Sequence, residues 1–132
     1  MSKSISKKII SWYCKYQRNL PWRNYKNLND KQYKVLVSEF MLQQTQVNTV
    51  IPFFNAFYKK YKNIQSLSKT SNTRILKSWQ GLGFYRRAKN LHATSKIICQ
   101  KHKGKIPSNY NELIELPGVG DYTAKAILAI AF

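Results

Sequence analysis

Apolar residues recur at three- and four-residue intervals along almost the whole chain, which is the spacing of one face of an α-helix. No stretch shows the strict alternation and turn chemistry of a β-hairpin. A polar loop is expected over residues 24–31. The pattern predicts an all-α protein with helices over residues 4–17, 32–43, 46–61, 64–68, 71–79, 84–102, 109–116 and from about 121 to the end.

Cap and turn residues mark the ends of these helices. Ser71 is expected to cap the helix that follows it, and either Ser108 or Asn109 the helix through Leu116. Gly104 is expected to end the long helix before it. Pro52 lies inside a predicted helix, where it requires a kink or a position in the first turns.

The last predicted helix reaches Phe132 with no glycine and no polar tail after it. Several of its apolar side chains therefore lack a following element to cover them. The sequence looks cut short at its C-terminus, and we expect marginal stability and a tendency to aggregate.

The amino-acid composition gives the chain a strong positive charge. The 132 residues carry 23 lysines and arginines against five acids, a net charge of +18 that is spread along the chain. With 43% hydrophobic residues the chain is long enough and apolar enough for one folded domain. A folded, basic domain with many aromatics is most simply a nucleic-acid binder. The alternative is a solvated lysine-rich surface that reflects an A+T-rich gene.

The sequence does not have the features of a membrane-spanning or secreted protein. No apolar run is long enough for a membrane span, and the N-terminus does not have the pattern of a signal peptide. Cys14 and Cys99 are far apart and are expected to be buried free thiols, which suits a reducing, cytoplasmic setting. His92 and His102 lack metal-ligand spacing and are expected at the surface or in helix packing. The tryptophans are expected in the core.

Glu39 is the most informative residue. It is one of five acids and lies in an apolar helical run, with Val35, Leu36, Phe40 and Leu42 as its neighbours on the helix. Burial there would disfavour the charged form and raise the pKa of the carboxyl, which is how an acid becomes a proton donor near neutral pH. An ordinary surface glutamate is the alternative.

Leu116-Pro-Gly-Val-Gly120 between two helices is a helix–hairpin–helix signature. Gly118 and Gly120 permit unusual backbone angles and close approach. With Val119, they would present backbone amides at a helix N-terminus, where a phosphate can bind without any reading of bases. A tight turn without a ligand is the alternative, and Asp121 would oppose a nearby phosphate.

Two further segments contain side chains suited to DNA. Gln43 and Gln44 follow a helix end, from which they could reach base edges or fill the gap left by an extruded base. The segment Gly81–Arg87 places Phe84 and Tyr85 on a glycine turn beside two arginines, which suits stacking on bases together with phosphate contact. For the two aromatics, we expect one to be buried and the other to be functional.

Taken together, four segments resemble the adenine DNA glycosylases, the MutY family of the helix–hairpin–helix glycosylase superfamily. The resemblance covers about residues 10–132, and its most specific block is Ser-Glu-Phe-Met-Leu-Gln-Gln-Thr-Gln. The four segments are Leu20–Arg23, Tyr33–Val47, Gly81–Leu91 and Leu116–Ala124.

The resemblance implies one helical domain over residues 1–132, in which residues 1–22 form an N-terminal helix and a Pro-Trp turn. Residues 23–132 would form a helical barrel with the helix–hairpin–helix at about 109–132. The family removes adenine mispaired with 8-oxoguanine or guanine from double-stranded DNA. The chain would then be a monomer in the bacterial cytoplasm, associated with the nucleoid.

The resemblance also implies roles for individual residues. Glu39 falls on the acid that protonates the flipped adenine, and Tyr122 on a tyrosine that assists at the sugar in some members. Gln43 falls on a residue that wedges into the duplex, beside Gln44. Tyr85, next to Arg86, falls on the tyrosine that intercalates beside 8-oxoguanine. Arg23 would lie near the adenine pocket.

The chain also departs from the family. The family's Asp, which stabilises the sugar cation, and the four cysteines of its 4Fe–4S cluster come after Phe132, so no cofactor is expected in these 132 residues. The activity of this chain alone is expected to be low. One alternative is a DNA-binding remnant without catalysis. The other, an endonuclease III-like lyase, would require a lysine at the position of Tyr122, and Lys125 is three residues further on.

Overall fold

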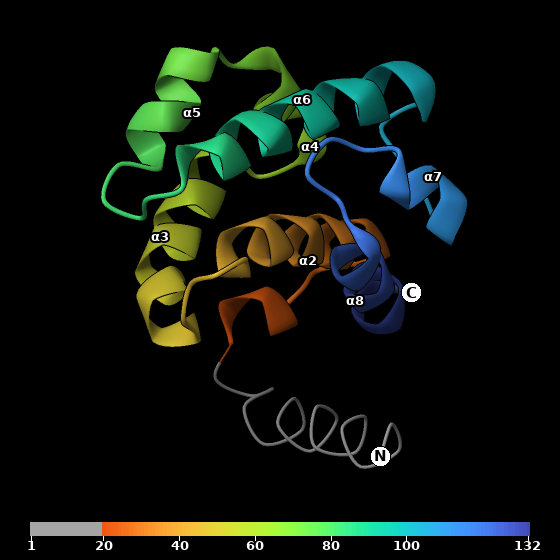
Figure 1. Ribbon diagram of the computed structural model, residues 1–132, viewed down its shortest axis with the longest axis horizontal. Helices are drawn as coiled ribbons and strands as arrows, with labels where there is room; N and C mark the ends of the chain where they lie inside the picture. The colour runs from red at the N-terminus through yellow and green to blue at the C-terminus, as the bar shows by residue number, and fades with distance from the viewer. Residues whose placement is uncertain (1–19) are drawn as a thin grey trace.

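The computed structural model describes residues 20–132, and the helix predicted over 4–17, with Trp12 and Cys14, lies outside them. The described part of the chain is helical without strands, as predicted (Figure 1). Its elements are η2 (Pro21–Arg23), α2 (Leu28–Leu42), α3 (Val47–Lys60), α4 (Ile64–Lys69), α5 (Asn72–Ser78), α6 (Tyr85–Lys101), α7 (Tyr110–Ile114) and α8 (Asp121–Ala131).

Helix α2 forms the centre of the fold. It packs against η2, α3, α6 and α8, and Figure 1 shows it between α3 and α8. The residues from Tyr33 to Met41 are all buried because neighbouring elements cover several sides of the helix. The aromatic core beside it includes an edge-to-face pair, Trp22 and Phe54, with ring centroids 5.2 Å apart. Trp79 is fully buried as well, so the expectation that Trp22 and Trp79 lie in the core is confirmed.

The predicted loop over 24–31 is wrong in its second half, because α2 begins at Leu28. Asn27 caps the helix by accepting a hydrogen bond from the Asp30 amide at 2.9 Å. Apart from the exposed Leu28, the first turn is polar, so it lacks the apolar periodicity that marks the rest of the helix. At α7 the error is opposite: the helix ends at Ile114, not Leu116, because the chain tightens into a turn in which the Leu116 amide donates to the Leu113 carbonyl.

Most other boundaries agree with the sequence. Ser71 caps α5 by accepting from the Arg74 amide, and Asn109 caps α7. Gly104 follows the end of α6 with a φ of +79°, a conformation that glycine adopts without strain. Pro52 lies within the second turn of α3. His92 is buried and hydrogen bonds Asn72 of α5, which confirms its helix-packing role.

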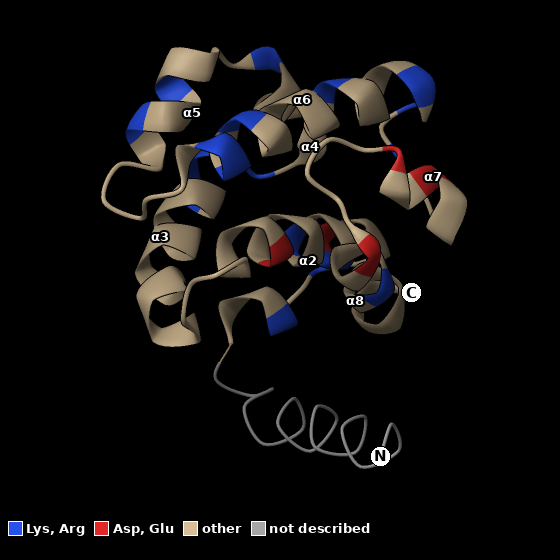
Figure 2. Ribbon diagram, viewed as in Figure 1, with Lys and Arg blue, Asp and Glu red and all other residues tan. Residues whose placement is uncertain are grey.

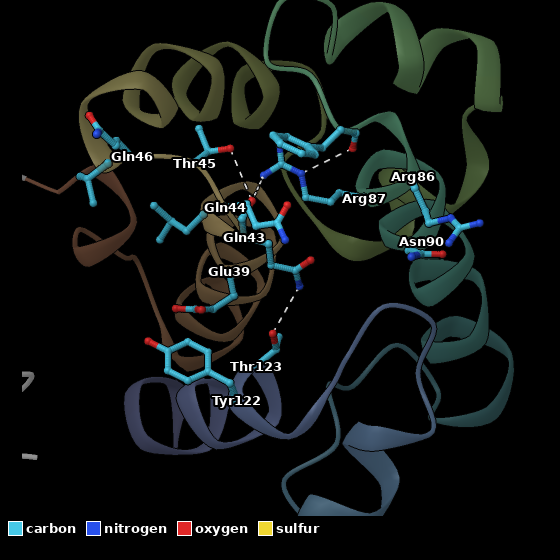
Figure 3. Close-up of a pocket in the computed structure, with 13 residues that line it drawn as sticks. Glu39, Gln43, Gln44, Thr45, Gln46, Arg86, Arg87, Asn90, Tyr122 and Thr123 are labelled. Atoms are coloured by element: carbon cyan, nitrogen blue, oxygen red, sulfur yellow. Dashed lines mark hydrogen bonds between the residues drawn. The ribbon is translucent and has the colours of Figure 1, made fainter. Parts of the chain in front are cut away.

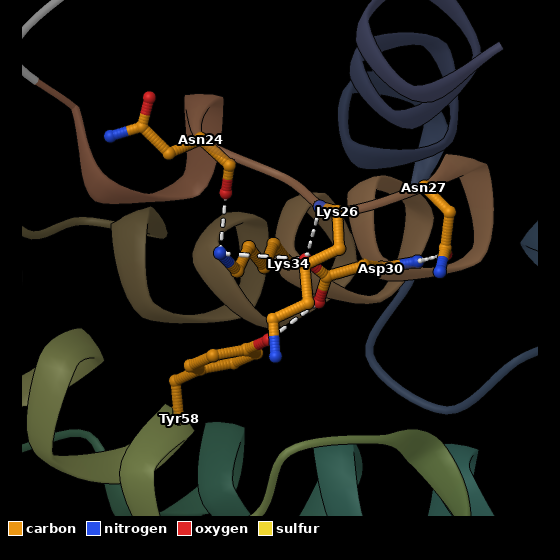
Figure 4. A network of polar contacts seen from close by, with 6 residues as sticks. All are labelled: Asn24, Lys26, Asn27, Asp30, Lys34 and Tyr58. Atoms are coloured by element: carbon orange, nitrogen blue, oxygen red, sulfur yellow. Dashed lines mark hydrogen bonds and ion pairs between the residues drawn. The ribbon is translucent and has the colours of Figure 1, made fainter.

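A polar network fixes the beginning of α2 to α3 (Figure 4). Asp30 accepts hydrogen bonds from the Tyr58 hydroxyl at 2.6 Å and the Lys26 amide at 3.0 Å, and its carboxylate lies 3.6 Å from the Lys34 ammonium. Burial alone would raise the pKa of Asp30, but these partners outweigh it and hold the pKa below its ordinary value. Burial, together with the bonded Asp30, raises the pKa of Tyr58 to about 12. Tyr58 is therefore a neutral donor at physiological pH.

No helix in residues 20–132 is long and apolar enough to cross a membrane.

Candidate nucleic-acid interface

An open cavity of about 900 Å³ lies where α2, α6 and α8 meet (Figure 3). Its walls come from the end of α2 and the turn after it, from the start of α6, and from the start of α8. The sequence predicted functional side chains in all three places, although they are separated by up to about 80 residues. The lining residues are Glu39, Leu42, Gln43, Gln44, Thr45, Gln46, Val47, Phe84, Arg86, Arg87, Asn90, Tyr122 and Thr123.

Glu39 lines this cavity from the last turns of α2. Its exposed fraction is 6%, so the expectation of a buried carboxyl is confirmed. Figure 3 shows Glu39 and Tyr122 directed into the same part of the cavity, and Tyr122 is 72% exposed. Glu39 is the only acid among the lining residues of this described cavity. A nearly buried acid therefore faces open space large enough for a small planar molecule.

Gln43 connects the end of α2 to the hairpin turn between α7 and α8, residues 116–120. It occupies the C-cap of α2, and its side-chain Nε2 donates to the Gly118 carbonyl at 3.2 Å and to Thr123 Oγ1 at 3.3 Å. Gln44 follows in the left-handed conformation, with a φ of +60°, and its side chain is exposed. The two glutamines thus differ: Gln43 is held against the hairpin, whereas Gln44 is presented to solvent.

The hairpin turn brings its backbone close to α6 and α2. Gly118 has a φ of +78°, and a Cβ there would lie 2.8 Å from Asn90 Cβ and 3.0 Å from a ring carbon of Phe40. Gly120 forms the N-cap of α8 with an ordinary extended backbone, and a Cβ there would meet nothing within 4 Å. Of these two hairpin glycines, Gly118 alone requires glycine for both its conformation and its space.

The expectation that the whole turn presents unpaired amides is wrong at Val119. Its side chain is buried, and its amide donates to the Leu116 carbonyl at 3.1 Å. The first intrahelical bond of α8 runs from Ala124 to Gly120, so the amides of residues 120–123 precede any intrahelical partner. The positive end of α8 thus points out beside the cavity, which favours an anion.

Asp121, at the start of α8, is partly neutralised by its neighbours. It accepts a hydrogen bond from the Tyr110 hydroxyl at 2.6 Å and lies 3.2 Å from the Lys125 ammonium. The hydrogen bond from Tyr110, followed by that from Lys125, lowers the pKa of Asp121. The lowered pKa keeps Asp121 ionised, and the Lys125 ammonium offsets part of the charge that Asp121 presents to an anion at this helix end. Lys125 itself is exposed and does not line the cavity.

The turn before α6 presents two aromatic rings, and the expectation that one of them would be buried is wrong. Phe84 is 57% exposed and Tyr85 45% exposed. Phe84 has a φ of +51°, which turns the chain sharply at the start of α6 and directs both rings away from the core. Phe84 lines the cavity, and Tyr85 lies immediately beside it in sequence.

The two arginines after this turn have different environments. Arg86 is exposed on the cavity wall, where it can meet a phosphate. Arg87 is 6% exposed, and its guanidinium donates to backbone carbonyls at the end of α2. The expectation that both arginines suit phosphate contact is therefore wrong for Arg87, because these carbonyls already occupy its donors.

Arg23 does not line the cavity. It lies half-buried in η2, which packs against α2 and α3, and its predicted place near an adenine pocket stays a prediction. Sequence reasoning missed Asn90 and Thr123. Asn90 lies one helical turn after Arg86 on α6, and Thr123 directly follows Tyr122, so their proximity to recognised residues was the available signal.

Basic residues are distributed over several elements of the fold, and two of them, Arg86 and Arg87, line the cavity. Figure 2 shows lysines and arginines distributed over α4, α5 and α6, while acids are few and lie mainly on α2, α7 and the start of α8. Within residues 20–132 no group of three or more His, Cys, Asp or Glu side chains could hold a metal ion. The Cys99 thiol is half-buried and donates to the Ile64 carbonyl.

Comparisons with known proteins agree with this geometry. Residues 37–131 match the family described as HhH-GPD superfamily base excision DNA repair protein. The chain is 48% identical over 125 residues to an adenine DNA glycosylase of Buchnera aphidicola subsp. Baizongia pistaciae, covering 94% of this chain and 34% of that protein. It is 40% identical over 134 residues to an adenine DNA glycosylase of Rattus norvegicus, covering 98% of this chain and 26% of that protein.

Solved structures show the same fold. A thermostable thymine-DNA glycosylase superposes with a TM-score of 0.74 at 26% identity, covering 99% of this chain and 61% of that one. A non-covalent endonuclease III–DNA complex superposes with a TM-score of 0.75 at 19% identity, covering 100% of this chain and 60% of that one. The all-α architecture is therefore that of helix–hairpin–helix glycosylases. The chain spans about a third of the length of the first curated relatives that it matches.

Proposed function

The chain belongs to the HhH-GPD superfamily of base excision DNA repair proteins, and from this premise we propose that it binds duplex DNA and receives an extruded adenine in the cavity beside Glu39. The adenine would come from a mispair with 8-oxoguanine or guanine. These 132 residues would then supply the DNA-binding hairpin and the acid of an adenine-specific, monofunctional glycosylase.

The observation that carries this proposal is the position of Glu39. Its carboxyl is nearly buried, yet it lines an open cavity of about 900 Å³ beside the N-terminus of α8. A base in the duplex is stacked and paired, so an enzyme that acts on it must first rotate it out of the helix. A cavity with an acid on its wall and an anion-binding helix end beside it suits a flipped nucleotide: the base enters and its phosphate stays outside.

Glu39 would act on the leaving base. Protonation of the adenine ring lets it depart with the electrons of the N-glycosidic bond, and water then attacks the sugar cation. A second carboxylate is needed to stabilise that cation and to direct the water. No acid other than Glu39 lines the described cavity. We therefore expect these 132 residues alone to bind DNA but to release adenine slowly.

DNA binding would combine phosphate contacts with exposed side chains that insert between the bases of the duplex. The amides at the start of α8 and the exposed Arg86 would hold phosphates, while Gln44, Phe84 and Tyr85 are exposed where a duplex would lie. Such contacts release counterions, so affinity should fall by orders of magnitude between about 50 and 200 mM salt if roughly six phosphates are neutralised. Salt-insensitive affinity, or no binding by folded protein at low salt, would contradict the proposal.

The test of the acid is single-turnover adenine release from a duplex with adenine opposite 8-oxoguanine, with Glu39→Gln as the matched variant. We expect tight binding by both proteins, slow release of adenine by the wild-type chain and still slower release by Glu39→Gln. Fast release that disappears in Glu39→Gln would establish the role of Glu39 and overturn the expectation of low activity. Equal, measurable release by both proteins would contradict the role of Glu39.

The same reaction distinguishes a lyase. A lyase forms a Schiff base between a lysine and the sugar, which borohydride traps as a covalent protein–DNA product. Tyr122 lines the cavity and no lysine does so among the described lining residues. We expect no trapped product, and a trapped product that depends on Lys125 would favour the lyase.

A further inference from the structure

Arg87 joins the two turns that flank the cavity. One guanidinium nitrogen, Nη1, donates to the Met41 carbonyl at 2.5 Å and the Gln43 carbonyl at 2.6 Å. The other, Nη2, donates to the Gly83 carbonyl at 3.1 Å. A single side chain on α6 thus connects the end of α2, which lies 46 residues away in sequence, to the glycine turn before α6.

Each of these two turns contains a residue other than glycine in the left-handed conformation. Gln44 has a φ of +60° and Phe84 a φ of +51°. Side chains other than glycine adopt this conformation at a cost, so it persists where surrounding contacts enforce it, often at functional sites. Arg87 bonds the carbonyl of the residue before each of them, Gln43 and Gly83. It also lies 5.0 Å from the centre of the Phe84 ring.

Burial of this arginine without a carboxylate has a physical explanation. None of the ion pairs found in residues 20–132 involves Arg87. Its charge lies at the C-terminus of α2, where carbonyls without intrahelical partners form the negative end of the helix dipole. The face of Trp79, 5.7 Å away, gives a second favourable contact. The carbonyls and the ring together replace the water that the guanidinium has lost.

We propose that Arg87 is a positioning residue that locks the two turns into one preformed wedge, with the exposed side chains of Gln44 and Phe84 held at a fixed separation. This inference rests on the proposed function. The wedge would set the discrimination between a duplex with an extrudable base and a fully paired one. Attraction to the phosphates would instead come from the hairpin and from exposed cations such as Arg86.

The geometry requires arginine and not merely a positive charge. The planar guanidinium has several donors in a fixed fork and can reach carbonyls on both turns at once. A lysine ammonium on a flexible stem would satisfy one turn and release the other. Arg87→Lys should therefore keep the charge and loosen the wedge, whereas Lys89→Met, exposed on the same helix, removes a charge and leaves the wedge intact.

The experiment compares wild type, Arg87→Lys and Lys89→Met on two duplexes, one fully paired and one with 2-aminopurine opposite 8-oxoguanine. Melting curves confirm folding, fluorescence anisotropy gives each Kd, and 2-aminopurine emission reports unstacking. We expect wild type and Lys89→Met to bind the 2-aminopurine duplex preferentially and to raise its emission. Arg87→Lys should keep its affinity for the paired duplex and lose both the preference and the emission increase.

The outcomes separate this inference from the proposed function. If wild type neither binds nor raises emission, the proposed function fails. If wild type does both and folded Arg87→Lys matches it, the positioning role is overturned. If Arg87→Lys does not fold, arginine side-chain ¹⁵N NMR of wild type decides: Arg87 signals should stay in place when paired duplex is added while Arg86 signals move. An Arg87 signal that moves as far as that of Arg86 would make Arg87 a phosphate ligand and overturn the inference.

Discussion

Replacing Gly118 by alanine should destabilise the fold through two separable effects. The φ of +78° places an L-residue in the left-handed region, which costs about 1–2 kcal/mol. The new Cβ would also lie 2.8 Å from Asn90 Cβ and 3.0 Å from the Phe40 ring, so buried groups must move. Overpacking of this kind costs about 1–3 kcal/mol. The sum, about 2–5 kcal/mol, is a large part of the stability of an ordinary domain.

Substitutions at two other glycines separate these effects. Gly83→Ala has a φ of +82° but meets nothing within 4 Å, so it should cost only the conformational part, about 1–2 kcal/mol. Gly120→Ala has neither problem and should change stability by less than about 1 kcal/mol. The measurement is urea unfolding of the three variants and wild type. Equal free energies of unfolding for Gly118→Ala and Gly83→Ala would refute the close approach of the hairpin to α6.

Three further predictions follow from other contacts. Tyr58→Phe removes a hydrogen bond that lowers the pKa of Asp30. A lowered carboxyl pKa stabilises the fold above the unfolded pKa of about 4, and this stabilisation is lost as the pH falls further through the lower, folded pKa. The destabilisation by Tyr58→Phe in urea unfolding should therefore be full near pH 7 and shrink as the pH falls below about 4. A difference in free energy of unfolding between wild type and Tyr58→Phe that does not change with pH would contradict the network. Thr123→Val should weaken DNA binding because Gln43 loses a hydrogen-bond partner at the hairpin, and Thr123→Ser, which keeps the hydroxyl, should bind like wild type. Equal Kd values for wild type and Thr123→Val would show that this hydrogen bond does not contribute to DNA binding. The exposed side chains of Tyr122, on α8, and of Phe132, at its C-cap, favour association, so light scattering should detect aggregation on mild heating. A sharp melt of a soluble monomer above about 60 °C would contradict this expectation.

The sequence predicted most of the helices and the main residues of the site, because both depend on local chemistry. Apolar periodicity locates α3, α6 and α8, and the isolated acid in an apolar run identified Glu39 as buried. The start of α2 was missed because its first turn is held by the Asn27 cap and the Asp30 network and not by apolar burial. Local patterns do not reveal a helix turn of that kind.

The errors at the site arose from contacts between distant segments. Arg87 looked like a phosphate ligand because its charge is visible in the sequence, whereas the carbonyls that bind it come from a helix end 46 residues away. One of Phe84 and Tyr85 was expected to be buried, but the left-handed backbone at Phe84 leaves both rings exposed. Similarly, the role of Thr123 depends on Gln43, which is 80 residues away in sequence.

The central claim is that an extruded adenine reaches Glu39, and carboxyl ¹³C NMR tests it most directly. The chain has only three glutamates, so its side-chain carboxyl spectrum is simple, and the signal lost in Glu39→Gln identifies Glu39. Addition of a duplex with adenine opposite 8-oxoguanine should move the Glu39 signal and leave that of Glu112, on α7, in place, while a fully paired duplex should move neither. A Glu39 signal that stays unchanged while the mispaired duplex is fully bound would contradict the account.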